Sequence, residues 1–139
     1  MVTNALLMSL LTWIGSHTSY DVSKVTLPYV EYHTKAELQD IYYGDCTRDV
    51  NRVIVAVYDE KKEGTIYLNK KINPRKKEDV AVVVHELFHH VQHTNKEKMP
   101  KSKEDREKET IVVENMWRTE HRLNKTAFTP SEAIYTCSN

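Results

Sequence analysis

The stretch that most constrains this chain is His85-Glu86-Leu87-Phe88-His89, an H-E-x-x-H pentapeptide. On an α-helix, residues i and i+4 lie on one face a turn apart, so both imidazoles can reach a single metal ion at about 2.0–2.1 Å. Glu86 then lies beside the ion, offset from the two ligands, where its carboxylate can accept a proton from an attacking water. The spacing therefore predicts a helix that carries two ligands of one Zn²⁺ ion together with a general base.

The residues around the pentapeptide predict a half-buried helix over 74–94. Asn73-Pro74 is a favourable start, because proline fits the first turn of a helix. The two histidines and Gln92 lie on a face that adjoins an apolar stripe, which places the metal ligands at the edge of the core, where a cleft can form. The stripe consists of Val80, Val84, Leu87, Phe88 and Val91.

The length and charge of the chain limit the number of domains it can form and the partners it can bind. A chain of 139 residues can bury about two-thirds of its unfolded surface in one core, so we expect a single domain over residues 1–139. Lys+Arg and Asp+Glu number 20 each, which gives a formal net charge of zero. No whole-chain basic field favours nucleic acid or an anionic membrane, and we expect no nucleic-acid partner.

The apolar run over 5–14 has the length of a signal-peptide core. No Lys or Arg precedes it, however, and no small-x-small cleavage site follows it. An amphipathic helix over 4–16, capped by Asn4, fits the pattern better. The run is also too short to span a membrane.

The two cysteines leave the compartment open. Cys46 and Cys137 lie far apart in the sequence. They can form one disulfide in an oxidising compartment or remain two thiols in a reducing one. Both a cytoplasmic and a periplasmic or secreted location are therefore compatible with the sequence, as is any oligomeric state.

The rest of the chain predicts an α+β fold. The strongest strand signal is a β-hairpin over 52–68, in which two β-rich runs flank a polar turn. An extended edge strand over 25–33 contains Pro28, and a short helix over 35–43 follows it, with Thr34 as its cap and Gly44 as its end. We expect this small sheet to pack on the helix that carries the pentapeptide.

A second long helix is predicted over 102–123. Ser102 begins it in a sequence that resembles a capping box, and Asn124 is a suitable end. A short terminal helix over 129–135 would follow. The second helix is acidic, and it is the place to look for a further metal ligand.

A catalytic zinc ion needs three protein ligands and one open position, and the pentapeptide supplies only two. His93 is one turn beyond His89, but three histidines one turn apart span about 12 Å of helix axis and cannot meet at one ion. The three-histidine motif is absent, because Gln92 and Asn95 stand where its glycine and third histidine would be. The third ligand must therefore come from another element.

Three glutamates of the second helix are candidates for the third ligand. Glu109 stands one turn before Val112 and Val113 on the apolar stripe, and a carboxylate there is costly unless it is paired or bound to metal. Glu107 and Glu114 share the neighbouring face, where a solvated flank is the simpler interpretation. Glu109 is thus the preferred third ligand, and Glu107 and Glu114 remain alternatives.

The H-E-x-x-H motif followed by a separate Glu-bearing helix resembles the gluzincin branch of zinc metallopeptidases. In that branch a glutamate some twenty or more residues downstream is the third ligand, a spacing that Glu109 fits. Nearly the whole chain is also similar to a family of small bacterial proteins known mainly as a domain of unknown function. The similarity lies in Leu10-Leu11-x-Trp13-Ile14, Val57-Tyr58-Asp59, Thr65-Ile66-Tyr67-Leu68, the run 84–92 and Trp117.

These resemblances imply a minimal zincin-like fold with one zinc site, but no substrate. Aligned on Trp117, the family pattern would place the ligand at Glu107 rather than Glu109. The chemistry implied is hydrolysis of a peptide bond in a peptide or protein substrate, with Glu86 as the general base. We expect the strand over 65–68 to pair with an extended substrate.

A second group is needed to stabilise the oxyanion, and the candidates are Tyr67, Tyr135 and His121.

Two other functions compete with the peptidase. A formylmethionine deformylase would use an upstream cysteine such as Cys46, but its surrounding glycine-rich pattern is absent. A zinc-binding regulatory or interaction module would have no need of Glu86, so that carboxylate favours an enzyme.

Overall fold

The computed structural model describes residues 1–44, 54–62 and 64–128. Within these residues the chain is a mixed α+β fold, as predicted, with four helices and one three-stranded sheet. In chain order the elements are α1 (Asn4–His17), β1 (Tyr29–His33), α2 (Lys35–Tyr43), β2 (Ala56–Tyr58), β3 (Thr65–Asn69), α3 (Lys77–Thr94) and α4 (Lys103–Glu120).

The sheet has the order β1-β3-β2, with β1 parallel and β2 antiparallel to β3. The predicted hairpin is confirmed over its described part, and the predicted edge strand is confirmed at Tyr29–His33. β3 is nonetheless the central strand, because both of its edges are hydrogen-bonded to neighbours. The prediction that the strand over 65–68 pairs with substrate is therefore wrong, since no edge of β3 is left for another strand.

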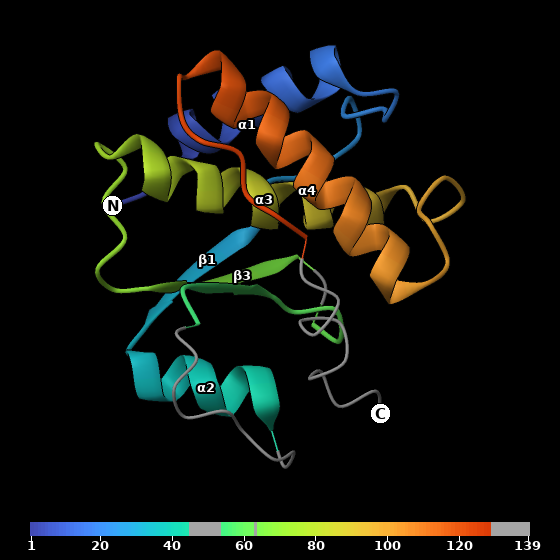
Figure 1. Ribbon diagram of the computed structural model, residues 1–139. Helices are drawn as coiled ribbons and strands as arrows, with labels where there is room; N and C mark the ends of the chain where they lie inside the picture. Colours follow the sequence, from blue (N-terminus) through green and yellow to red (C-terminus); the bar gives the residue numbers. More distant parts are fainter. Residues whose placement is uncertain (45–53, 63, 129–139) are drawn as a thin grey trace.

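The helices cover the two faces of the sheet unequally (Figure 1). α3 contacts the sheet through β2 and is flanked by α1 and α4, whereas α2 packs on the opposite face. The larger core lies between the sheet and α3, where Ile66 and Leu68 meet Val84, Leu87 and Phe88, all fully buried. A smaller core of Leu38, Tyr43, Ile54 and Tyr67 lies beneath α2.

α1 is the predicted N-terminal helix, but Thr3, not Asn4, caps it. The Thr3 hydroxyl accepts the Leu6 N–H at 3.1 Å, and Asn4 is the first helical residue. The apolar stripe of the helix, including Leu7 and Ile14, is buried against the core. None of the described helices is long and apolar enough to cross a membrane.

α3 begins at Lys77, three residues later than the predicted start at 74. The Asn73 side chain accepts the Arg75 N–H at 3.0 Å, and the Asn73 carbonyl accepts the Lys76 N–H at 2.9 Å. Asparagine side chains compete in this way with helical hydrogen bonding, and here they form a turn ahead of the helix.

α4 begins with the predicted cap, because the Ser102 hydroxyl accepts the Asp105 N–H at 3.0 Å. It ends at Glu120 rather than 123, because Arg122 adopts a left-handed φ of 61° and the Leu123 N–H returns to the Arg118 carbonyl at 2.8 Å. The chain therefore reverses direction sooner than predicted. The predicted terminal helix lies outside the described residues.

The central strand gives a test of the core. We expect Ile66→Ala to lower the free energy of unfolding by about 2–5 kcal/mol, because Ile66 has 0% exposure and its loss leaves a cavity between the sheet and α3. Val112→Ala is the control, since Val112 is 60% exposed and we expect a change below about 0.5 kcal/mol. Urea unfolding of both variants measures the difference, and equal effects would contradict this account of the core.

Candidate metal centre

The H-E-x-x-H residues lie in the middle of α3, on the side that faces α4. The imidazole rings of His85 and His89 are one helical turn apart, with centroids 5.0 Å from each other. Potential ligand atoms of His85, Glu86 and His89 lie within 4.8 Å of one another, so the group could hold a metal ion. Glu86 and His89 are buried and His85 is nearly so, which is the enclosed setting that such a site needs.

The Glu107 carboxylate of α4 spans the two histidines. Its Oε1 lies 2.8 Å from Nε2 of His85, and its Oε2 lies 3.0 Å from Nε2 of His89. In a tetrahedral zinc site with bonds of about 2.0–2.1 Å, ligand atoms are about 3.3–3.4 Å apart. The two nitrogen–oxygen contacts would need to lengthen by about 0.5 Å to admit such an ion. Two imidazole nitrogens and a carboxylate oxygen are ligands of a kind that zinc accepts.

Glu109, the preferred third ligand from the sequence, is directed elsewhere. Its Oε1 accepts hydrogen bonds from the Tyr20 hydroxyl at 2.5 Å and from the Gln92 amide at 3.0 Å. The sequence-based choice assumed that the stripe containing Val112 faces the core, but Val112 is 60% exposed. Val113 of that stripe is buried, but the other inward residues of α4 are Glu107, Thr110, Ile111, Glu114 and Trp117.

That misassignment has a physical cause. Hydrophobic periodicity locates a buried face only where the buried face is apolar. Here α4 packs against the two histidines of the pentapeptide, and its inward face carries two carboxylates that contact them. Two signals in the sequence pointed to the right face. The family pattern aligned on Trp117 places the ligand at Glu107, and Glu107, Thr110, Ile111 and Glu114 are spaced at i, i+3, i+4 and i+7.

Glu114, the remaining candidate, holds the other side of the His85 ring. Nδ1 of His85 lies 2.8 Å from Oε1 of Glu114, whose Oε2 accepts Nε of Arg118 at 2.5 Å. Arg118 in turn donates to Oε2 of Glu78 at 2.7 Å. A proton on Nδ1 satisfies Glu114 and leaves Nε2 facing the Glu107 carboxylate.

His89 is oriented in the same way by a neutral partner. Its Nδ1 lies 3.0 Å from Oε1 of Gln92, and the Gln92 amide donates to the Arg106 carbonyl and to Glu109, each at 3.0 Å. Because the amide nitrogen has two acceptors, its oxygen must face His89 and accept the Nδ1 proton. Glu109 therefore supports His89 through Gln92 and contacts neither Nε2 atom.

Burial and neighbouring charges have opposing effects on the pKa of each of these groups. Burial by itself would lower the pKa of His85, but its contacts with Glu107 and Glu114 raise that pKa well above its usual range. Burial by itself would raise the pKa of Glu107, yet the two histidines hold it far below its usual value. Burial raises the pKa of Glu86, and the nearby histidines only partly offset the rise.

A model of one protein family matches residues 1–129, which is nearly the whole chain, and its description is "Domain of unknown function (DUF6647)". The chain belongs to this family. No curated protein and no solved structure matches the chain significantly. Membership of DUF6647 specifies no reaction.

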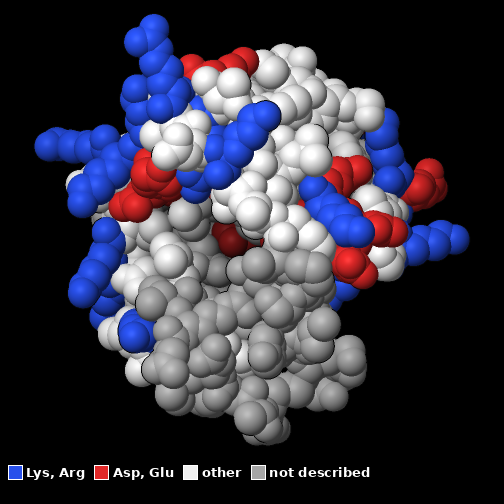
Figure 2. Space-filling view, viewed as in Figure 1, with Lys and Arg blue, Asp and Glu red and all other residues white. Residues whose placement is uncertain are grey.

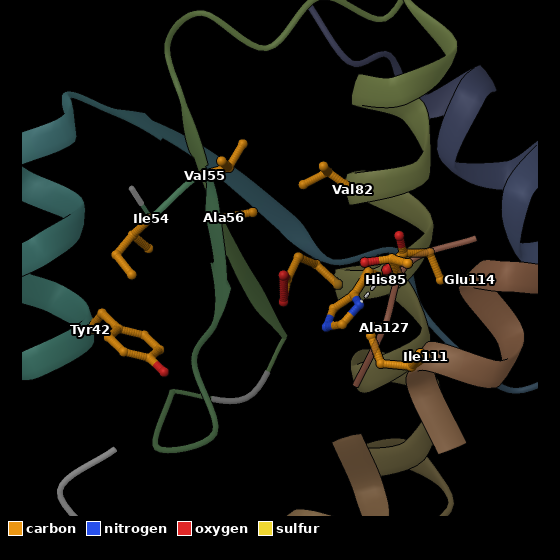
Figure 3. Close-up of a pocket in the computed structure, with 11 residues that line it drawn as sticks. Tyr42, Ile54, Val55, Ala56, Val82, His85, Ile111, Glu114 and Ala127 are labelled. Carbon is orange, nitrogen blue, oxygen red and sulfur yellow. Dashed lines mark hydrogen bonds and ion pairs between the residues drawn. The ribbon is translucent and has the colours of Figure 1, made fainter. Parts of the chain in front are cut away.

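A cavity of about 320 Å³ opens beside His85 and Glu86. Figure 3 shows Val82 and His85 of α3 on one side of it and Tyr42 of α2 on the other. On the face viewed in Figure 2, an acidic side chain lies at the bottom of a hollow. The lining residues described are Tyr42, Ile54, Val55, Ala56, Val82, His85, Glu86, Ile111, Glu114, Thr126 and Ala127.

β2 is the strand that borders this cavity. The Val55 carbonyl and the Asp59 N–H are hydrogen-bonded to β3, at 2.8 and 3.1 Å. In an antiparallel pair, alternate residues point their backbone groups to opposite edges. The N–H and C=O of Ala56 therefore face the outer edge of the sheet, on which no strand among the described residues pairs.

Two of the three residues predicted to stabilise an oxyanion, Tyr67 and His121, have other partners. The Tyr67 hydroxyl donates to Oδ2 of Asp59 at 3.0 Å, and burial raises the pKa of Tyr67 to about 12. His121 stacks on Trp117 at the end of α4, with ring centroids 3.7 Å apart. Neither side chain lines the cavity, and Tyr135 lies outside the described residues, as do both cysteines.

The other histidines of α3 have separate partners. His90 lies between the Tyr58 hydroxyl at 3.1 Å and the Thr26 carbonyl at 2.7 Å, which is a structural role. Nε2 of His93 and Nη2 of Arg106 lie 3.5 and 3.6 Å from Oε1 of Glu60 in the β2–β3 turn. This contact connects the hairpin turn to both long helices, α3 and α4.

The Glu60 contact predicts a pH dependence of stability. Its interaction with His93 lowers the pKa of Glu60 from 4.5 to about 2, with Lys103 and Arg106 adding to the effect. A carboxylate with a lowered pKa stabilises the fold above its unfolded pKa and loses that contribution as the pH falls through its folded pKa. Glu60 is 35% exposed, so we expect Glu60→Gln to cost only about 1 kcal/mol at pH 7.

The difference between wild type and Glu60→Gln should therefore shrink as the pH falls from about 4.5 towards 2. Urea unfolding at pH 7, 5 and 3 measures it. Glu104→Gln is the matched control, because Glu104 pairs only at the surface with Lys108, at 3.6 Å. A Glu60 effect that stayed constant from pH 7 to pH 3 would contradict the assignment.

Proposed function

We propose that this protein is a zinc-dependent metallopeptidase with a minimal zincin-like fold. His85, His89 and Glu107 would hold one Zn²⁺ ion, and Glu86 would act as the general base. The observation that carries the proposal is the single Glu107 carboxylate that faces both Nε2 atoms while both Nδ1 atoms are engaged from behind. A histidine that binds a metal usually donates its other ring N–H to a carboxylate, a carbonyl or water, and both histidines here have such a partner.

The donor set supports a catalytic rather than a structural site. Structural zinc sites are closed by four protein ligands, usually including cysteine, whereas catalytic sites combine three ligands with an open position. Here two imidazoles and one carboxylate face each other, and the cavity at His85 and Glu86 gives access to them. Glu86 is not needed to complete this ligand set, and it is buried beside it.

The chain's own residues then divide the work of hydrolysis. A bound zinc ion supplies Lewis acidity, which polarises a carbonyl group and lowers the pKa of water. Glu86 accepts a proton from the attacking water as the new C–O bond forms, and it delivers that proton to the amine nitrogen as the C–N bond breaks. Glu86 is buried and lines the cavity, so it can reach a water that approaches the histidines from there.

Two further features would position the substrate. The outward N–H and C=O of Ala56 can pair with an extended peptide by strand addition, which assigns to β2 the role that the sequence suggested for β3. Tyr42 is the one phenol among the described lining residues, and it faces His85 across the cavity (Figure 3).

A zinc-binding interaction module with little or no hydrolytic activity is the second candidate. The observation that favours it is the short segment after α4, because Thr126 and Ala127 form part of the cavity wall. The two candidates share the metal site and differ in turnover. Metal binding and catalysis therefore need separate tests.

The metal site is tested by a matched pair of glutamates. We expect the wild-type protein to bind one zinc ion per chain. Glu107→Gln should weaken zinc binding by at least about 100-fold, because it removes a ligand, while Glu109→Gln should weaken it by less than about 10-fold, because Glu109 acts only through Gln92. Competition with a chromophoric chelator measures both affinities. The reverse order would restore Glu109 as the third ligand.

Catalysis is tested at Glu86. We expect zinc-loaded wild type to cleave unfolded casein or short peptides, and Glu86→Gln to retain zinc while its kcat falls by about 10²- to 10⁴-fold. His89→Ala, which loses a ligand, should lose zinc and activity together. Full activity in Glu86→Gln would refute its role as the base. A zinc-loaded wild type that cleaved nothing would favour the interaction module.

A further inference from the structure

The connection between β3 and α3, together with the first residue of α3, carries a concentrated positive charge. Residues 70–77, which we call the basic loop, contain four lysines, one arginine and no acidic residue, although the whole chain has a formal net charge of zero. Figure 1 shows this connection at the left of the molecule, and Lys and Arg side chains gather along the same side in Figure 2. The basic side chains are all exposed: Lys70, Lys71, Arg75, Lys76 and Lys77.

The carboxylates that follow or approach the basic loop already have partners. Glu78 accepts from Arg118 at 2.7 Å. Asp79 accepts the Asn73 N–H at 2.8 Å. Glu37, an acidic residue of α2 near the loop, is held in the capping box of its own helix. The basic side chains outnumber these three engaged carboxylates, and a local excess of positive charge attracts anionic groups.

Local contacts fix the backbone of the basic loop. The Lys71 N–H donates to the Asn69 side chain at 2.9 Å, and the Arg75 N–H donates to the Asn73 side chain at 3.0 Å. Ile72 is buried and belongs to the larger core. The charges are therefore carried by a backbone that does not have to be ordered when a ligand binds.

The basic loop connects the β2 side of the cavity to its α3 side. It follows Asn69, whose N–H donates to the Val55 carbonyl at 2.8 Å, and it ends at Lys77, one and a half helical turns before Val82. Val55 and Val82 both line the cavity beside His85. A peptide that leaves the cavity between β2 and α3 in this direction therefore meets the basic loop.

The helical repeat gives the distance from the metal centre to the loop. From His85 back to Lys77 the axis of α3 advances by about 12 Å. An extended peptide advances by about 3.3 Å per residue, so about four residues cover that distance. We propose that the basic loop selects peptide substrates with acidic residues at about the fourth to sixth positions on one side of the cleaved bond. This inference rests on the proposed peptidase function and adds the class of substrate.

Nucleic acids and anionic membranes also bind positively charged surfaces. The position of the basic loop favours a peptide, because the loop adjoins the edge of β2 proposed for strand addition and lies within a few peptide residues of His85. The chain as a whole has no net charge with which to attract a polyanion.

The test uses two series of probes that bind zinc at one end and extend from it in opposite chain directions. Peptidyl hydroxamates place their peptide on the N-terminal side of the zinc-binding group, and mercaptoacyl peptides place it on the C-terminal side. Each probe is otherwise neutral and carries glutamates, glutamines or lysines at the fourth to sixth residues. In one series we expect zinc-loaded wild type to prefer glutamate over glutamine by at least about 10-fold, because several exposed charge pairs each contribute modestly. Isothermal titration calorimetry measures the affinities without turnover, and added salt should weaken the preference.

A charge-reversed loop is compared with a matched control. Lys76→Glu combined with Lys77→Glu places glutamates at the start of α3, where they are compatible with a helix. This variant should lose the glutamate preference and gain a lysine preference, while its affinity for the glutamine probe stays within about 2-fold. Lys24→Glu combined with Lys101→Glu makes the same change in charge at two exposed lysines outside the loop and should keep the glutamate preference. Zinc content is measured for every variant.

Vesicles containing phosphatidylserine and a single-stranded DNA test the other anionic partners. Binding of either one that depends on Lys76 and Lys77, together with equal affinity for the glutamate and glutamine probes, would assign the loop to that partner and overturn the acidic-peptide inference.

The outcomes separate this inference from the proposed function. Equal affinity for all probes, a glutamate preference that survives reversal of the loop charge, or one that the control variant loses equally would overturn the inference, even if peptides are cleaved. A glutamate preference that depends on the loop would support it, even if no peptide is cleaved and the peptidase proposal fails. A wild-type protein that takes up no zinc would overturn both, because the metal sets the distance from the cleaved bond to the loop.

Discussion

The contact on which the rest of this structure depends is the one between the Glu107 carboxylate and the two Nε2 atoms of His85 and His89. It determines how α4 is rotated against α3, because only one face of α4 carries Glu107. That rotation buries Glu114 behind His85 and leaves Val112 in solvent. An interface between two long helices, which would ordinarily be apolar, is here organised around charged and polar groups.

Such an interface is stable only if each buried polar group has a partner. His85 is engaged at both ring nitrogens, and the chain of contacts continues through Glu114 and Arg118 to Glu78 at the surface. His89 is supported through Gln92 by Glu109 and Tyr20. These two series of side-chain contacts differ, since the one behind His85 is ionic and the one behind His89 passes through a neutral amide. Together they hold the imidazoles while keeping their Nε2 atoms directed at one point.

Most of the secondary structure was predictable because local signals and tertiary packing agree. The cap at Thr34, the end of α2 at Gly44 and the start of α4 at Ser102 all depend on side chains next to the backbone groups that they satisfy. The errors lie at helix ends. The turn made by Asn73 delays the start of α3, and the left-handed Arg122 ends α4 early. These features involve competition between local hydrogen bonds, which residue preferences do not resolve.

The sequence by itself determined that His85 and His89 share one helical face with Glu86 beside them, because that relation follows from the helical repeat. It also determined the hairpin and the α+β class. Only the tertiary structure decided that Glu107 rather than Glu109 meets the histidines, and that β2 rather than β3 borders the cavity. The physical reason is that both depend on how one element is rotated or ordered beside another. Such relations are set by contacts between residues distant in sequence.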